Sequence, residues 1–234
     1  MVPKWMTALS ATLETYPESK TYALATIGEN SPRVRHIVHR SFISPNGNVP
    51  LLISTTDIRS PKVSQIIPHR GQSHNAEIVW WIQEPNEQYR ITGRVYILPI
   101  SGHPLHSQFP AQRLAPKERE NGDAAAWWEI QRIDTFDNKM GGALRASFCR
   151  PTPGSELPGG YESGREWPDT LPQSTEAERG SVDEKNVWTA LNNFALMVLE
   201  PVSVDRIELS AVPNRRTCWM LAGHGVWTER ILVP

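Results

Sequence analysis

The stretch TYALATIGENSPRVRHIVHRSF, residues 21–42, decides the fold class of this chain. Residues 21–27 and 33–42 are rich in strand-forming side chains, and Gly28-Glu29-Asn30-Ser31-Pro32 between them has the composition of a turn. The stretch therefore predicts a β-hairpin.

Further strands are predicted on the C-terminal side of this hairpin. Residues 49–54 follow a turn signal at 44–48, and residues 76–82 and 88–98 flank a turn at 84–86. Near the end, apolar runs at 194–199, 204–209, 217–221 and 226–233 are separated by Pro201, Pro213-Asn214 and Gly223-His224-Gly225. These seven or so short strands predict a mainly β fold, a barrel or a sandwich.

Few helices accompany these strands, and we expect them at the periphery. Trp5, Met6, Leu9 and Leu13 recur at helical spacing. Ser60 followed by Pro61 suits the start of a second helix, and residues 124–132 and 139–148 predict two more.

Residues 1–234 are expected to form one domain with one irregular segment. Residues 151–182 are crowded with Pro, Gly, Ser and Glu and show little apolar periodicity. They predict an exposed excursion, at about 155–185, that does not hold the core together.

Composition excludes several function classes. The formal net charge of -1 gives no overall field for nucleic acid or an anionic membrane. Cys149 and Cys218 are too few for a disulfide framework, and the polar start of the chain matches neither a signal peptide nor a membrane span. His36 and His39 would point to opposite faces of a strand, so no metal site is expected. A cytoplasmic protein is predicted.

Residues 33–40 and 54–62 carry groups that suit a phosphorylated ligand. The second segment offers hydroxyls and a predicted helix start, whose N–H groups favour an anion, and Lys62 adds a full charge. Arg35 on the first segment could make a forked contact to phosphate oxygens. A solvated strand edge, with Ser60 acting only as a helix cap, explains the same spacing, and this alternative stays open.

Several short motifs, taken in order, resemble one family over most of the chain outside about 155–185. Residues 35–40 look like the Arg-x-Val-x-x-Lys strand of pyridoxamine 5'-phosphate oxidases, and residues 55–62 resemble their Tyr-Thr-x-x-x-Ser-Arg-Lys loop. Residues 87–93 are similar to their Arg-Gln-Val-Arg-x-x-Gly strand. Residues 145–148, 151–154, 193–196, 200–201 and 227–230 resemble the Alr4036-like branch.

This resemblance implies a split β-barrel of Greek-key type that holds FMN at a homodimer interface. It implies a flavin phosphate held by Arg35, Thr56, Ser60 and Lys62. It also implies that Thr55 and Gln88 face the isoalloxazine ring and that the backbone of Ile37 and Val38 bonds the pyrimidine edge of the ring.

Departures from the family pattern shape the predicted activity. Pro61 stands where the oxidases carry an arginine, and Arg59 is a candidate replacement. Arg40 replaces a lysine associated with substrate phosphate. The segment Arg215-Arg216-Thr217-Cys218-Trp219 keeps arginine but lacks the histidine of the substrate-binding cluster.

Arg40, Arg215 and Arg216 are the candidate substrate-binding residues, and no catalytic side chain is assigned. The expected function is an FMN-dependent oxidoreductase acting on an unidentified small molecule. A non-catalytic FMN-binding or sensing protein, a true pyridoxamine 5'-phosphate oxidase, and a barrel whose flavin site has decayed remain alternatives.

Overall fold

The structure is a computed structural model that describes residues 2–45, 47, 49–67, 75–117 and 123–234. The chain forms two compact units. Unit 1 comprises residues 1–54, 65–96 and 198–234, and unit 2 comprises residues 55–64 and 97–197. The single domain expected for residues 1–234 stays a prediction.

One eight-stranded sheet runs through the chain in the order β3-β2-β1-β4-β5-β6-β7-β8. An additional pairing of β3 with β6 closes six of these strands into an antiparallel barrel, which confirms the predicted mainly β class with peripheral helices. The strands are β1 Thr21–Ile27, β2 Pro32–Ile43, β3 Leu51–Asp57, β4 Asn75–Ile82, β5 Glu87–Leu98, β6 Phe194–Glu208, β7 Arg215–Leu221 and β8 Trp227–Leu232.

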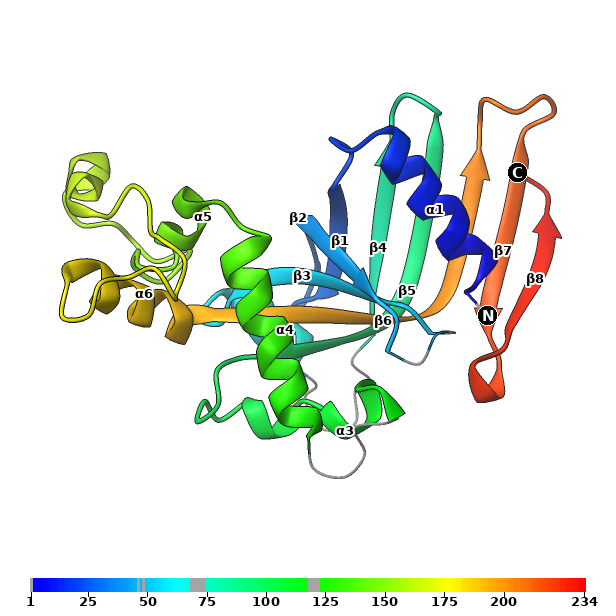
Figure 1. Ribbon diagram of the computed structural model, residues 1–234. Coiled ribbons are helices and arrows are strands. Elements are labelled where there is room, and N and C mark those ends of the chain that lie inside the picture. The colour runs from blue at the N-terminus through cyan, green and yellow to red at the C-terminus, as the bar shows by residue number, and fades with distance from the viewer. Residues whose placement is uncertain (1, 46, 48, 68–74, 118–122) are drawn as a thin grey trace. The chain divides into compact units, whose positions relative to one another are not determined.

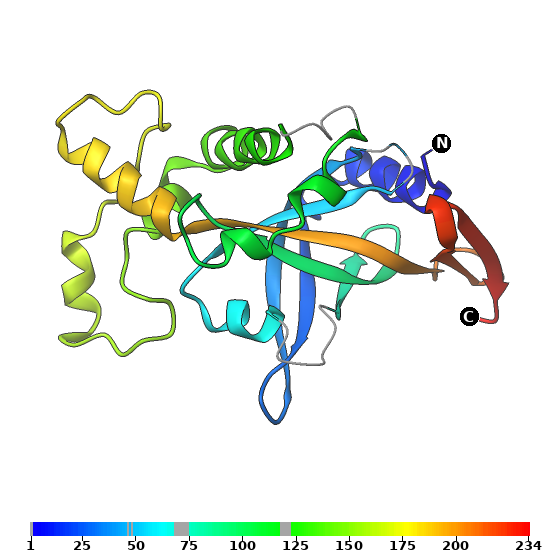
Figure 2. The same cartoon turned by 90° about the horizontal axis from the view of Figure 1, so that it is seen from below.

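Alternation along the strands builds the core of unit 1. The predicted first hairpin is present, with Thr21 opposite Val38 and Ile27 opposite Pro32, and its turn projects from its neighbours in Figure 2. In the pair of β4 and β5, Ile78 lies opposite Ile91, and the side chains of these two isoleucines are fully buried. Successive residues of a strand face opposite sides, so each strand supplies one apolar face to the interior.

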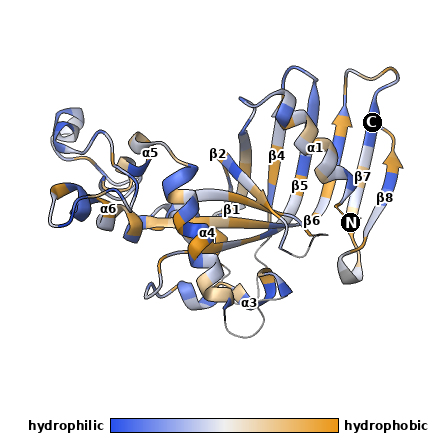
Figure 3. Ribbon diagram, in the orientation of Figure 1, coloured by the Kyte–Doolittle hydropathy of each residue, from blue (hydrophilic) through white to orange (hydrophobic). Residues whose placement is uncertain are grey.

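Helix α1, Lys4–Thr15, covers part of this unit, as the sequence predicts. Its buried side chains are Trp5 and Leu9, and the helix lies across the strands of unit 1 in Figure 1. The start of α1 lies beside the hairpin of β7 and β8. Figure 3 shows that β8 is hydrophilic in its middle and hydrophobic at its end.

The two strands predicted at 194–199 and 204–209 are one strand, β6, and that boundary prediction is wrong. Pro201 was expected to separate them, but the φ angle that proline fixes is compatible with extended backbone, and its only other cost is one missing N–H. Strand β3 likewise continues past the predicted end at 54, to Asp57. Asn46 and Asn48 of the predicted turn at 44–48 lie outside the described residues.

Unit 2 is mainly helical. Its helices include α3 Ala111–Leu114, α4 Ala124–Asn138, α5 Gly142–Ser147 and α6 Val182–Asn193, and the short helix α2 Pro61–Ile66 begins in this unit. The described residues also form the 3-10 turns η1 His106–Gln108 and η3 Gly160–Glu166 in this unit and η4 Gly223–Gly225 in unit 1. The predicted helices at 124–132 and 139–148 correspond to α4 and α5.

Helix α6 was not predicted, although the sequence holds its start signal. Ser181 caps the helix by accepting a 3.0 Å hydrogen bond from the Glu184 amide. The Glu184 carboxylate in turn accepts one from the Gly180 amide at 2.6 Å. A serine followed three residues later by glutamate is a helix-start signature that the composition of the surrounding segment obscured.

The segment 151–182 is mostly exposed, but the expectation that it does not hold the core is wrong at Leu171. This side chain is 1% exposed. The Leu171 carbonyl accepts hydrogen bonds from the buried Arg145 guanidinium at 3.1 and 3.0 Å, and the same arginine bonds the carbonyls of Asp137 and Met140. A buried cation needs such partners, so the segment is part of what stabilises unit 2.

A buried histidine makes the stability of unit 1 depend on pH. His39 is 6% exposed and packs against Phe42 and Trp80. Burial, reinforced by the charges of Lys20 and Arg40, lowers the pKa of His39 to about 3. An unfolded histidine takes up a proton near its ordinary pKa of about 6.5. The folded state therefore loses stability as the pH falls from about 6.5 towards the lower value.

We expect His39→Phe to remove this dependence. Between pH 7 and pH 4.5 the free energy of unfolding should fall less in the variant, by on the order of 2 kcal/mol. Urea titrations at several pH values measure it, with His36→Phe, at an exposed position of the same strand, as the control. Parallel pH curves for the His39 variant and the parent would contradict the assignment.

Candidate functional site

Hydroxyl and ammonium groups gather at the end of β3 and the start of α2, within unit 2. Thr56 and Ser60 are buried, and their hydroxyl oxygens lie 3.1 Å apart. Both hydroxyls donate to the Asp57 carbonyl, at 3.0 and 2.7 Å. The Lys62 ammonium donates to Ser60 Oγ at 2.9 Å. Three of the predicted phosphate ligands therefore lie together, with a cation at the edge of the group.

Arg59 holds the turn that carries these groups. Its guanidinium forms a forked ion pair with the Asp57 carboxylate, at 3.0 and 2.7 Å. Its Nη2 also donates to the carbonyls of Arg150, at 2.9 Å, and Phe148, at 3.5 Å. The hydrogen bond with Asp57 raises the pKa of Arg59. The structure thus uses Arg59 to fix the turn, a role different from that of a replacement phosphate donor.

Arg35 is the predicted phosphate cation of unit 1, and it lies on β2 opposite Leu24. Its guanidinium donates to Thr26 Oγ1 at 2.5 Å, Gln65 Oε1 at 2.6 Å, the Leu24 carbonyl at 3.3 Å and the Arg33 carbonyl at 3.2 Å. All of these partners are neutral oxygens, and within the described residues no carboxylate pairs with it. Burial, together with the charge of Arg33, lowers the pKa of Arg35.

Such a cation is held in place without being neutralised. Neutral acceptors fix the direction of a guanidinium but leave its charge uncompensated, and the depressed pKa reflects that cost. An anion placed against it would regain the missing Coulomb energy.

The backbone groups of Ile37 and Val38 face opposite edges of β2. The backbone N–H of His39 donates to the Lys20 carbonyl at 2.7 Å. In an antiparallel pair, every second residue turns its backbone N–H and C=O towards the same neighbouring strand, so Ile37 and Arg35 also form backbone hydrogen bonds with β1. The amide and carbonyl of Ile37 therefore point to β1, and those of Val38 point to the other edge. The pairing of β2 with β3 ends at His39, opposite Ser54, which leaves Val38 beyond the last pair.

Gln88 and Thr55 occupy half-buried strand positions. Gln88 lies opposite Trp81 in the pair of β4 and β5, with its side chain on the polar face predicted for β5. The side-chain carboxamide of Gln88 makes no hydrogen bond among the described residues. Thr55 lies on β3 in unit 2, whereas Gln88, Arg35, Ile37 and Val38 belong to unit 1.

The candidate substrate arginines differ in their surroundings. Arg216 is bound by the Asp205 carboxylate, with Nη2 to Oδ2 at 2.7 Å, and Arg90 pairs with the same carboxylate at 2.9 Å. Arg215 is exposed, and Arg40 is half-buried on β2. Burial lowers the pKa of Arg40, and the nearby Tyr22 opposes that shift. Arg216 is therefore paired with a carboxylate within unit 1, whereas Arg215 is exposed to solvent.

Sequence reasoning missed the groups that orient the predicted site residues. Thr26 and Gln65 hold Arg35, and Asp205 holds Arg216. Thr26 lies two residues beyond Leu24 on the strand paired with β2, so hairpin register could have indicated it. Asp205 lies on β6, two residues from the partner of Arg216 in β7, so hairpin register could have indicated it as well. Gln65 comes from a distant part of the chain, and no local pattern indicates it.

The Arg59–Asp57 pair allows a direct test of how the turn is held. Asp57 is 9% exposed, so Arg59→Met leaves a buried carboxylate without its cation and should lower the free energy of unfolding by about 2–4 kcal/mol. Arg59→Lys should recover part of it, since a lysine cannot form the fork. A double-mutant cycle with Asp57→Asn should give a coupling energy of about 1–3 kcal/mol in urea titrations. Additive effects would show that the pair does not stabilise the turn.

Comparisons with known proteins agree with this geometry. Residues 2–99 match the family described as pyridoxamine 5'-phosphate oxidase, FMN-binding domain. Pyridoxine/pyridoxamine 5'-phosphate oxidase 2 of Arabidopsis thaliana is 27% identical over 215 residues, which cover 90% of this chain and 85% of that protein.

A crystal structure shares the fold. It is that of a pyridoxamine 5'-phosphate oxidase-related, FMN-binding protein from Nostoc punctiforme, with a TM-score of 0.70 and 23% identity over 100% of both chains. The predicted barrel type is thereby confirmed. The match of residues 2–99 to an FMN-binding domain bears out the predicted cofactor. Over residues 2–99 the chain therefore matches the FMN-binding domain family of the pyridoxamine 5'-phosphate oxidases, in agreement with the resemblance in its motifs.

Proposed function

We propose that this chain is an FMN-dependent oxidoreductase that acts on a small molecule as a cytoplasmic homodimer. The single observation that carries the proposal is Arg35, a cation that neutral oxygens hold in a fixed direction. The phosphate of FMN is the anion that would complete it. Bound FMN supplies the hydride chemistry, and the protein supplies binding, orientation and electrostatics.

Each residue assigned to FMN carries a group that suits one part of the cofactor. Arg35 and Lys62 would supply charge to the phosphate, and the hydroxyls of Thr56 and Ser60 would complete its ligands. The donor set fits a phosphate monoester, since it offers two cations and two hydroxyls and no carboxylate. Thr55, Gln88 and the backbone of Ile37 and Val38 are assigned to the ring system. Two observations support this assignment. The backbone of Val38 lies beyond the last residue pair of β2 and β3, and the side-chain carboxamide of Gln88 has no hydrogen-bond partner among the described residues.

Substrate binding is assigned to Arg40, Arg215 and Arg216. Of these, Arg216 already has Asp205 as a carboxylate partner. This pairing favours a second candidate function, an FMN-binding or sensing protein without turnover, because an arginine already paired with a carboxylate binds an anionic substrate weakly. The name of the Arabidopsis relative favours pyridoxine or pyridoxamine 5'-phosphate as the first substrates to test. Membership of the Alr4036-like branch stays a prediction.

A homodimer and a cytoplasmic location complete the proposal. On the outward face of unit 1, Val34, Val38 and Trp81 are 66%, 40% and 40% exposed. The registers of β1 with β2 and β4 place all three on one face, with Ala23 and Ala25 between them. These exposed apolar side chains lie among polar ones such as Glu77 and Gln88, a mixture that suits contact with a second copy of the chain. Cys149 and Cys218 are free thiols, which suits a reducing compartment. Separately, no helix among the described residues is long and apolar enough to cross a bilayer.

The phosphate assignment is tested by Arg35→Ala combined with Lys62→Ala. Removing two charge-assisted contacts should weaken FMN binding by at least about 100-fold, while riboflavin, which lacks the phosphate, should bind much as before. Flavin absorption and fluorescence titrations measure both ligands. A matched control is Arg33→Ala with Lys185→Ala, which makes the same charge change at exposed positions.

Unchanged FMN binding in the Arg35/Lys62 variant would refute the phosphate assignment. Oxidation of pyridoxamine 5'-phosphate by the flavin-loaded protein would identify the true oxidase among the alternatives. Tight FMN binding without turnover of any substrate tried would favour the non-catalytic protein.

The dimer is tested at its proposed face. Val34→Glu should convert the dimer to a monomer in sedimentation or light-scattering measurements, since it replaces an exposed apolar contact with a charge. Ile231→Glu is the control, at a position 84% exposed on β8 and away from that face. A parent protein that is monomeric would refute the assembly.

A further inference from the structure

A second candidate site lies in unit 1, on the hairpin of β7 and β8. Trp219 lies directly opposite Glu229, and Leu221 lies opposite Trp227. Trp227 and Glu229 are two residues apart on β8, so alternation places both on the face that carries Trp219. None of these residues is assigned to the flavin or to its substrate.

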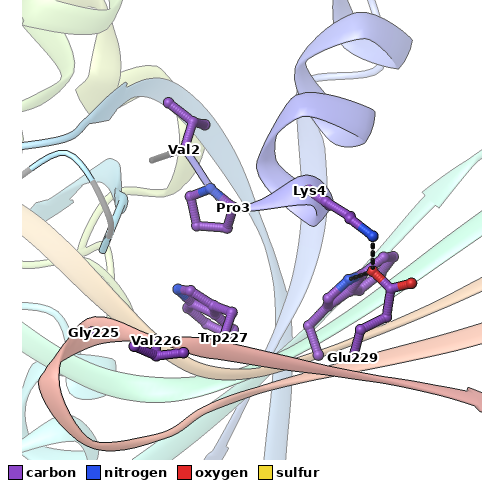
Figure 4. A pocket seen from close by; sticks show the side chains of 8 residues that line it. Val2, Pro3, Lys4, Gly225, Val226, Trp227 and Glu229 are labelled. Carbon is purple, nitrogen blue, oxygen red and sulfur yellow. Dashed lines mark hydrogen bonds and ion pairs between the residues drawn. The ribbon is translucent and has the colours of Figure 1, made fainter.

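The start of α1 covers this face and leaves a cavity of about 370 Å³ (Figure 4). Val2, Pro3 and Val226 form apolar walls, and Trp219 and Trp227 contribute indole rings. Trp5, which is fully buried, packs edge-to-face on Trp227 with ring centroids 5.4 Å apart and so backs that wall. A cavity of this size admits a small organic molecule.

Glu229 is the acidic group of the cavity. Its Oε2 accepts a hydrogen bond from Trp219 Nε1 at 2.9 Å and faces the Lys4 ammonium at 3.0 Å (Figure 4). These two contacts hold the pKa of Glu229 below its usual range. Its other oxygen, Oε1, makes no hydrogen bond among the described residues. The carboxylate is therefore held in a fixed orientation, and its Oε1 atom can accept a hydrogen bond from a ligand.

Lys4 competes only weakly for this carboxylate. Its side chain is 79% exposed, and an ion pair so open to water contributes little. An anionic ligand would meet the ionised Glu229 within the cavity, whereas a cationic ligand would meet both the carboxylate and the electron-rich indole faces. Charge complementarity selects the cation.

We propose that the cavity between α1 and the β7–β8 hairpin binds a small organic ammonium with an apolar body. Its charged head would lie against Glu229 and the rings of Trp219 and Trp227. The apolar body would contact Val2, Pro3 and Val226.

Three probes of nearly the same shape test the charge of the ligand. Choline, its neutral analogue 3,3-dimethylbutan-1-ol and the anion 3,3-dimethylbutanoate are titrated into the FMN-loaded protein by calorimetry and ligand-observed NMR. Choline should bind about tenfold or more tightly than the alcohol, and the anion should bind most weakly.

Two exposed substitutions separate the roles of the ion pair. Glu229→Gln should weaken choline binding by about tenfold, because the carboxylate charge is lost. Lys4→Met should strengthen it, because the competing ammonium is removed. Both variants should retain the circular dichroism spectrum and the FMN affinity of the parent, so failure here and failure of the flavin assignment are distinguishable.

Three outcomes would overturn the proposal. They are choline binding that is unchanged in Glu229→Gln, tighter binding of 3,3-dimethylbutanoate that depends on Lys4, and the absence of saturable choline binding to the parent.

Discussion

The flavin assignment depends on the charge of one arginine, Arg35, on the inward side of a barrel strand. Arg35 shares its side of β2 with Ile37 and His39, both of which are buried. A charge placed there is costly unless its donors are satisfied, and the chain satisfies them with Thr26, Gln65 and two backbone carbonyls. The chain supplies hydrogen bonds but no counter-charge, which is the arrangement expected where a ligand brings the counter-charge.

Other arginines show the contrast. Arg59 has Asp57, and Arg90 and Arg216 share Asp205. Each of these cations contacts a carboxylate of its own unit, which Arg90 and Arg216 share, and serves to fix a turn or a strand pair. A carboxylate partner compensates the charge of a guanidinium, whereas neutral oxygens do not. The partners of each guanidinium therefore distinguish a structural arginine from a ligand-binding one.

The same contrast applies to the aromatic side chains. Trp80 and Trp128 are fully buried and pack in the interiors of units 1 and 2. Trp219 and Trp227 instead line a cavity together with a carboxylate. The chain has nine tryptophans, but their number does not show which of them line a binding site. The role of an indole depends on its neighbours, which are set by strand register.

Local patterns in the sequence determined much of this protein. Alternation predicted the hairpins of β1 with β2 and of β4 with β5, and helical spacing predicted the buried face of α1. The order of short motifs indicated the family and the cofactor. These features depend on neighbours within one or two elements, so they can be read along the chain. The capping signal of α6 was equally local and was overlooked within a segment rich in Pro and Gly.

Only the tertiary structure decided which charges are paired. Asp205 meets Arg90, Arg145 meets Leu171, and Lys4 meets Glu229 across long separations in sequence. The continuity of β6 through Pro201 is also a tertiary result, since neighbouring strands hold the backbone extended there. The physical reason is that strand pairing and packing bring together residues whose separation in sequence carries no information about their contact.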